Sequence, residues 1–246
     1  MFIKNTNTPY TLIKQEWYLL PILSALLVIG TLPPLKLWWL CFVSIAPIYY
    51  FARISKKYTW KQTATGGFLF GVIFTAYILS LTLLQFHWVK EVYLFTYIIR
   101  ASSLVVLVFF GIFASTQIVV SRLICSNNAL VHIFFASSFW TLSEWIIHKI
   151  MLGIEYSVIG YPAHRSIFVS LARYGGVYAS IFAVALINIS IGSLVYYTIN
   201  KNSEYRNKNI TYSILVLLIV TSVGYITYTI QTREMNAQKQ SPIHIA

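Results

Sequence analysis

Long apolar runs recur along the whole chain, separated by short polar segments. The runs are close to 20 residues long and are continuous rather than alternating, which predicts membrane-spanning helices and not the strands of a barrel. We therefore expect an all-α fold, a polytopic membrane helical bundle with about seven transmembrane helices. The predicted spans are residues 17–32, 35–51, 66–86, 102–120, 129–147, 177–198 and 210–230.

Prolines and glycines shape the first runs. Pro33-Pro34 separates the first two, because proline lacks a backbone donor and its predecessor avoids helical angles. A single helix across both runs would also exceed the thickness of a bilayer, so we expect a hairpin. The third run opens with Gly66, Gly67 and Gly71, and such small residues let neighbouring helices approach closely.

Charged residues are few and mostly basic. The chain has 246 residues, is 58% hydrophobic and 10% charged, and carries 18 Lys and Arg against 6 acidic residues. Soluble domains contain about 25% charged residues, so the composition excludes an ordinary soluble domain. The basic residues lie in short loops, which is typical of membrane topology signals and not of a nucleic-acid interface. The cluster at 53–61 predicts a cytoplasmic N-terminus and, with an odd number of spans, an external C-terminus.

Few side chains in the apolar runs suit catalysis. Cys41 and Cys125 are interpreted as small hydrophobic residues rather than a disulfide, a metal pair or a nucleophile. No His-Glu-x-x-His motif or phosphate-binding glycine loop occurs, so we expect no metal and no cofactor. Glu144 lies well inside an apolar run, where a charge by default suggests function. The same pattern is equally typical of a carboxyl satisfied by a neighbouring helix.

The segment that follows, residues 153–162, is rich in glycine and aromatic residues. This composition is typical of an ordinary ordered loop with glycines at its turns. It also fits a rim that contacts lipid or peptide, because loops on rigid scaffolds often carry binding sites.

The same region resembles the bacterial apolipoprotein N-acyltransferases. Trp140-x-x-x-Glu144 is followed by Gly153, Tyr156 and Gly160-Tyr161, similar to the family's Trp-x-x-x-Glu helix and the glycine- and aromatic-rich loop after it. Further motifs agree in order and spacing. They are the Leu32-Pro33-Pro34-Leu35-x-x-Trp38 hairpin, the third span ending in His87-Trp88, and a Leu-x-x-x-x-Gly step at Leu171 and Gly176. The chain departs from the family at Ile147, where an arginine is common.

The resemblance implies an activity, and it implies that a membrane domain and a catalytic domain share it. Such enzymes move an acyl chain from a phospholipid to the amino group of a lipoprotein's lipidated N-terminal cysteine. They do so through a thioester on a cysteine of a nitrilase-like domain outside the membrane. The resemblance implies a transmembrane domain at 1–230 and an external tail at 231–246 that resembles the truncated start of that domain. We therefore expect an inner-membrane protein, truncated or half of a split enzyme, that is inactive alone.

The resemblance also implies the site and its partners. It assigns no catalytic residue to this chain, and it assigns substrate binding to Trp140, Glu144, Gly153, Tyr156, Gly160 and Tyr161. The expected partners are membrane phospholipid, a companion nitrilase-like chain and, where that chain is supplied, the lipoprotein substrate. Two other classes stay open on the residues alone: a small permease or transport subunit, and an adaptor that docks a partner without catalysis.

Overall fold

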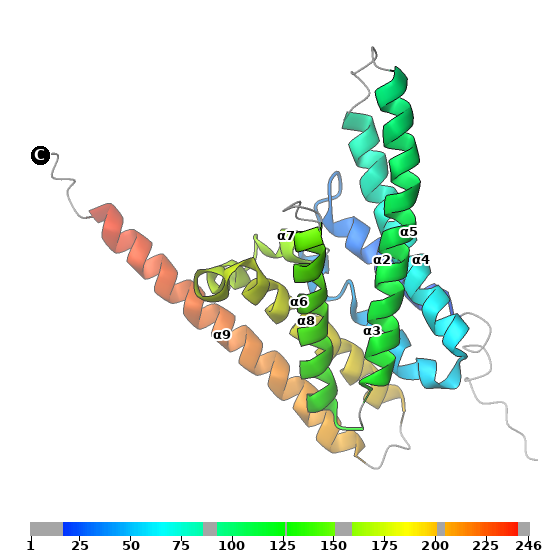
Figure 1. Ribbon diagram of the computed structural model, residues 1–246. Coiled ribbons are helices and arrows are strands. Elements are labelled where there is room, and N and C mark those ends of the chain that lie inside the picture. The colour runs from blue at the N-terminus through cyan, green and yellow to red at the C-terminus, as the bar shows by residue number, and fades with distance from the viewer. Residues whose placement is uncertain (1–16, 86–92, 126, 151–158, 201–204, 241–246) are drawn as a thin grey trace, which may run out of the picture.

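The protein is a bundle of helices, seen here in a computed structural model that describes residues 17–85, 93–125, 127–150, 159–200 and 205–240. Only the backbone is described for residues 82–85, 93–101, 161 and 238–240. These parts of the chain are mostly helical and contain no strand, which confirms the all-α prediction (Figure 1). Five of their helices are long and apolar enough to cross a membrane, so this is a multi-pass membrane protein. The five are α4 (Trp60–Gln85), α5 (Tyr93–Leu123), α6 (Ala129–Ile150), α8 (Ala172–Ile199) and α9 (Arg206–Gln240).

The first two predicted spans form a shorter hairpin than expected. It consists of α2 (Leu19–Thr31), the 3-10 helix η1 (Trp38–Phe42) and α3 (Ala46–Ile54). With 13 and 9 residues, α2 and α3 are about 20 and 14 Å long, less than the roughly 30 Å of a bilayer core. As predicted, the helix ends just before Pro33-Pro34, and the chain then spends several residues in η1 before α3 begins.

The short helix α3 lies at the centre of the core. Seven of its nine residues are buried, and it packs against α2, α5 and α8. The buried amide of Asn188 on α8 fixes its start: Oδ1 accepts from the Ile45 backbone at 3.0 Å, and Nδ2 donates to the Cys41 carbonyl at 2.7 Å. A side chain from α8 thus supplies the hydrogen bonds that the end of η1 and the beginning of α3 need.

Helices α4 and α5 pack as a close pair that reaches past the rest of the bundle (Figure 1). As the glycine pattern predicted, Gly67 and Gly71 face the α5 backbone, where an added Cβ would lie 2.6 Å from the Ser115 Cα and 2.5 Å from the Phe110 carbonyl oxygen. Helix α4 begins six residues before the predicted boundary. Thr59 and Gln62 form a capping box there, with the Gln62 amide donating to Thr59 Oγ1 at 3.2 Å and Gln62 Oε1 accepting from the Thr59 amide at 3.0 Å.

A helical break precedes the sixth predicted span. Gly175 and Gly176 have non-helical angles inside α8, and Gly176 has a φ of 64°, which glycine adopts without strain. The part of α8 after this break corresponds to the predicted span 177–198. Before it lie the short helices α7 (Gly160–Ala163) and η4 (Ile167–Leu171), which both pack against α8. Arg173, at the start of α8, forms an ion pair with Glu234 of α9.

Helix α9 continues through residues 231–240, which the sequence had assigned to an external tail. Residues 241–246, the end of the predicted tail, lie outside the described residues. In Figure 1 the C-terminal part of α9 extends away from the other helices.

Three connections meet at the end of the bundle where α4, α6 and α9 begin, the lower end of Figure 1. We call this end the loop face and define it by the described residues of 53–61, 122–128 and 197–209. Lys56 Nζ donates to the Cys125 carbonyl at 2.9 Å, and the Tyr197 hydroxyl donates to the Asn127 carbonyl at 3.0 Å. These bonds join the three loops on one side of the bundle. The alternation of the predicted spans places the same three loops on one side of the membrane.

Candidate active site within the membrane

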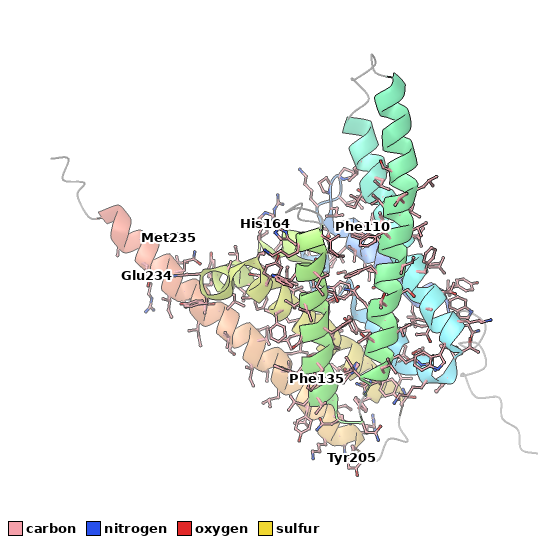
Figure 2. All side chains as sticks on the ribbon, viewed as in Figure 1. Phe110, Phe135, His164, Tyr205, Glu234 and Met235 are labelled. Carbon is pink, nitrogen blue, oxygen red and sulfur yellow. The ribbon has the colours of Figure 1, made fainter. Side chains whose placement is uncertain are left out.

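A hollow lies among α4, α5 and α6, and we call it the α4–α6 hollow. Each helix contributes residues three or four apart, so each lines the hollow with one face. The lining residues are Phe70, Gly71, Phe74 and Thr75 from α4, Phe110, Phe113, Ala114 and Gln117 from α5, and Trp140, Glu144 and Ile147 from α6. Figure 2 labels Phe110 on α5, at the part of that helix that faces α6. The walls are thus mainly aromatic and apolar, with four polar groups among them.

A second, apolar hollow continues from the first between α4 and α5. It shares Phe74, Thr75 and Phe110 with the first, and adds Ile78, Leu79 and Val106. From Phe70 to Leu79 the combined surface follows α4 for about 14 Å. The two hollows share these three residues and together form one surface with a mainly apolar lining.

Two buried donors in the hollow have no acceptor among the described residues. The Trp140 side chain is 1% exposed and the Thr75 side chain 4% exposed, and neither Trp140 Nε1 nor Thr75 Oγ1 has a hydrogen-bond partner there. A buried donor without an acceptor costs about 1–3 kcal/mol. A water molecule or a bound group with an acceptor oxygen would relieve that cost.

Glu144 lies one helical turn beyond Trp140 and is buried, with 7% of its surface exposed. It has interactions with its surroundings, including an electrostatic one with Tyr49 of α3. The Tyr49 ring in turn meets the Trp140 ring edge-on, with centroids 5.9 Å apart. Glu144 is therefore buried within the bundle, near Tyr49 of α3.

The predicted substrate-binding residues separate into groups. Trp140 and Glu144 line the α4–α6 hollow together, as their spacing requires. Gly160 and Tyr161 begin α7, which packs against η1 and α8, and Gly160 is not among the residues that line the hollow. Gly153 and Tyr156 lie outside the described residues.

Thr75 and Gln117 were not identified from the sequence. Gln117 is a polar residue inside an apolar run and could have been noticed in the same way as Glu144. Thr75 gives no such signal, because threonine is common in membrane helices, where its hydroxyl can bond to its own backbone. Ile147, at the position where the family commonly has an arginine, adds an apolar side chain to the same wall.

Neither cysteine lies in the hollow. Cys41 is completely buried beneath α8, and burial in apolar surroundings disfavours the thiolate that a nucleophile requires. Cys125 lies at the loop face as a free, half-buried thiol. Among the described residues, no three His, Cys, Asp or Glu side chains are grouped as a metal site would need.

A comparison with protein families identifies the family of this chain. The family model of the apolipoprotein N-acyltransferase N-terminal domain matches residues 24–190, which include most of α2, α3 to α6, the site and most of α8. No curated protein matches the chain in sequence.

Proposed function

This chain belongs to the family of apolipoprotein N-acyltransferase N-terminal domains, and from that premise we propose that it binds the phospholipid acyl donor for lipoprotein N-acylation. The membrane is the bacterial inner membrane, with the N-terminus cytoplasmic and the C-terminus outside. The α4–α6 hollow is the donor site. The observation that carries the proposal is the pair of buried donors, Trp140 Nε1–H and Thr75 Oγ1–H, inside an aromatic, apolar hollow.

An acyl chain and its ester group make different demands on such a site. The chain needs apolar contact, which the phenylalanine side chains of α4 and α5 offer. Burying the ester carbonyl inside the bundle costs free energy unless a hydrogen-bond donor lies beside it, and Trp140 and Thr75 can supply such donors. We assign to Glu144 the positioning of Trp140 and of the 153–162 segment.

The covalent chemistry is assigned to a companion nitrilase-like chain acting in trans. Its cysteine thiolate attacks the ester carbonyl, forms a thioester and releases the lysophospholipid. The lipoprotein amine then attacks the thioester, forms the amide and returns the thiol. We expect this chain alone not to acylate a diacylated lipoprotein. Robust transfer by the purified chain, lost in Cys41→Ser or Cys125→Ser, would overturn that assignment.

A photo-cross-linking experiment tests the donor site. The purified protein is reconstituted with a phospholipid that carries a diazirine in one acyl chain. After cross-linking, the labelled peptides are identified by mass spectrometry. Trp140→Phe keeps the ring but removes the N–H donor, and Thr75→Val keeps the shape but removes the hydroxyl. Because one hydrogen bond contributes about 1 kcal/mol, each variant should lose about fivefold of the cross-links to α4, α5 and α6.

The matched control is Trp145→Phe on the same helix, where the side chain is 43% exposed. It removes the same chemical group from the outside of the bundle and should leave the cross-links unchanged. Cross-links spread over all lipid-facing helices, and insensitive to Trp140→Phe and Thr75→Val, would refute the donor site.

The role of Glu144 is tested separately by protease susceptibility of residues 153–165 in membranes. Glu144→Gln keeps the shape and most hydrogen bonding, whereas Glu144→Leu removes both. We expect faster cleavage in the Leu variant only. Equal cleavage in the wild type and both variants would show that Glu144 does not organise this segment.

A further inference from the structure

The loop face carries a concentration of positive charge. Its exposed or half-exposed cations are Lys56, Lys57, Lys61, Arg206 and Lys208, and two further guanidinium groups, Arg53 and Arg122, are buried beneath them. The described part of this face contains no carboxylate. The described acidic residues are Glu144 in the α4–α6 hollow and Glu234, which pairs with Arg173 near the other end of α9. Glu204, in the third loop, lies outside the described residues.

The two buried guanidinium groups lie over aromatic rings. Arg122 lies over the Trp60 ring at 3.9 Å and donates to Thr63 Oγ1 at 2.6 Å. Arg53 lies over the rings of Tyr196 and Tyr197, each at 4.7 Å. Aromatic faces and hydroxyl groups stabilise a cation without cancelling its charge. The Arg122 charge therefore adds to the positive potential of the exposed lysines above it.

The face is also held in a fixed shape. The Asn127 carbonyl accepts two hydrogen bonds from the 197–209 connection, one from the Tyr197 hydroxyl at 3.0 Å and one from Asn209 Nδ2 at 2.8 Å. The nearby Cys125 carbonyl accepts one from Lys56 Nζ of the 53–61 connection at 2.9 Å. Arg206 Nε donates to the Tyr197 carbonyl at 3.1 Å. The cations are therefore presented by three connections joined to one another and not by separate loops.

Aromatic side chains place this face at the membrane boundary. Trp60 and Tyr205 are both 50% exposed beside the cations, and Figure 2 shows Tyr205 at the end of the bundle where α9 begins. Tryptophan and tyrosine concentrate at the level of the lipid headgroups, and lysine side chains extend to the same level from the apolar helix surface. At this level the available anions are the phosphates of lipid headgroups.

We propose that the loop face is a binding site for anionic phospholipid headgroups, with Lys57, Lys61 and Lys208 as the cations that reach the phosphates. Lys56 also lies at this face, and its ammonium group donates to the Cys125 carbonyl. The site is separate from the α4–α6 hollow and does not depend on acyl transfer. A basic residue near an anionic membrane surface contributes an affinity factor of about five.

The test measures bound lipids by native mass spectrometry of the purified full chain with phosphatidylglycerol or phosphatidylcholine. We expect the wild type to retain more phosphatidylglycerol than phosphatidylcholine. The triple variant Lys57→Gln, Lys61→Gln, Lys208→Gln should lose that excess by about fivefold or more. The matched control, Lys149→Gln, Arg165→Gln, Arg233→Gln, removes the same charge from exposed residues away from the loop face and should keep it.

Three outcomes would overturn the proposal. One is an equal loss in the triple variant and the control, which would mean a general charge effect. Another is displacement of phosphatidylglycerol by soluble glycerol 3-phosphate, which would mean a site for a free anion. The third is no preference for phosphatidylglycerol in the wild type, which would leave the cations as topology signals only. If the triple variant fails to fold, the double variant Lys61→Gln, Lys208→Gln gives the same comparison with an expected smaller loss.

Discussion

The contact between α4 and α5 depends on two positions that have no side chain. A Cβ added at Gly71 would lie 2.5 Å from the Phe110 carbonyl oxygen and 2.8 Å from the Ala114 Cβ. These atoms belong to the backbone or directly adjoin it, so they cannot rotate away. Gly71→Ala should therefore force the two helices apart, and this is the perturbation that best tests how the bundle is held together.

The size of the effect follows from the distances. Ordinary van der Waals contact begins at about 3.4 Å, so the helices must separate locally by about 0.9 Å to accept the new methyl group. Overpacking of this kind costs about 1–3 kcal/mol. Gly67→Ala meets the same helix, with its Cβ 2.6 Å from the Ser115 Cα. The double variant should cost less than the sum of the two, because the first alanine already separates the helices for the second.

Two measurements check this prediction. Denaturant unfolding in detergent gives the change in stability, and spin labels at the exposed positions Thr65 of α4 and Thr116 of α5 report the separation of the helices. The control is Ala76→Val, which adds carbon atoms to an exposed position of α4 and should change neither quantity. The reasoning is wrong if Gly71→Ala unfolds like the wild type with an unchanged distance between the labels.

Three further predictions concern other parts of the bundle. Asn188→Leu should lower the free energy of unfolding by about 1–3 kcal/mol, because the buried amide and carbonyl that it bonds lose their partner, while the exposed Asn207→Leu should change it little; denaturant unfolding compares the two. Arg122→Lys should lower the free energy of unfolding by about 1 kcal/mol although the charge is retained, and the same unfolding assay measures this change. The reason is that an ammonium group cannot both stack on the Trp60 ring and donate to two acceptors, as the guanidinium group does. Reporter fusions at Lys57 and after Ala246 should report opposite compartments, the first cytoplasmic, and the same compartment for both would rule out an odd number of crossings between them.

The sequence predicted the helices better than it predicted their ends. Hydropathy locates an apolar run but not the residue at which the helix begins. The third span was placed from Gly66, whereas the Thr59-x-x-Gln62 capping box starts α4 at Trp60. This signal is present in the sequence and is independent of hydropathy. The first two spans show a different limit, because a helix buried among others is as apolar as one that crosses a bilayer. Only the packing shows that α2 and α3 are short.

Part of the candidate site was also within reach of sequence reasoning. Trp140 and Glu144 are four residues apart on one helix, so their common face follows from helical geometry. Thr75 and Gln117 lie on different helices, and what brings them to the same hollow is the close contact of α4 with α5 at Gly67 and Gly71. The glycines predicted a contact but not its partner or its register. Such convergence depends on packing between distant segments, which a single sequence does not specify.

The bonds made by Asn188 have a consequence for how the protein is assembled. Asn188 lies 143 residues after Ile45 and accepts a hydrogen bond from its backbone N–H. It lies 147 residues after Cys41 and donates a hydrogen bond to its carbonyl. A ribosome adds about 5–20 residues per second, so α8 is synthesised roughly 7–30 s after the hairpin that it completes. During that interval the start of α3 lacks its native hydrogen-bond partner. The hairpin therefore reaches its final structure only after α4, α5 and α6 have been synthesised, and the centre of the core is among the last parts of the protein to form.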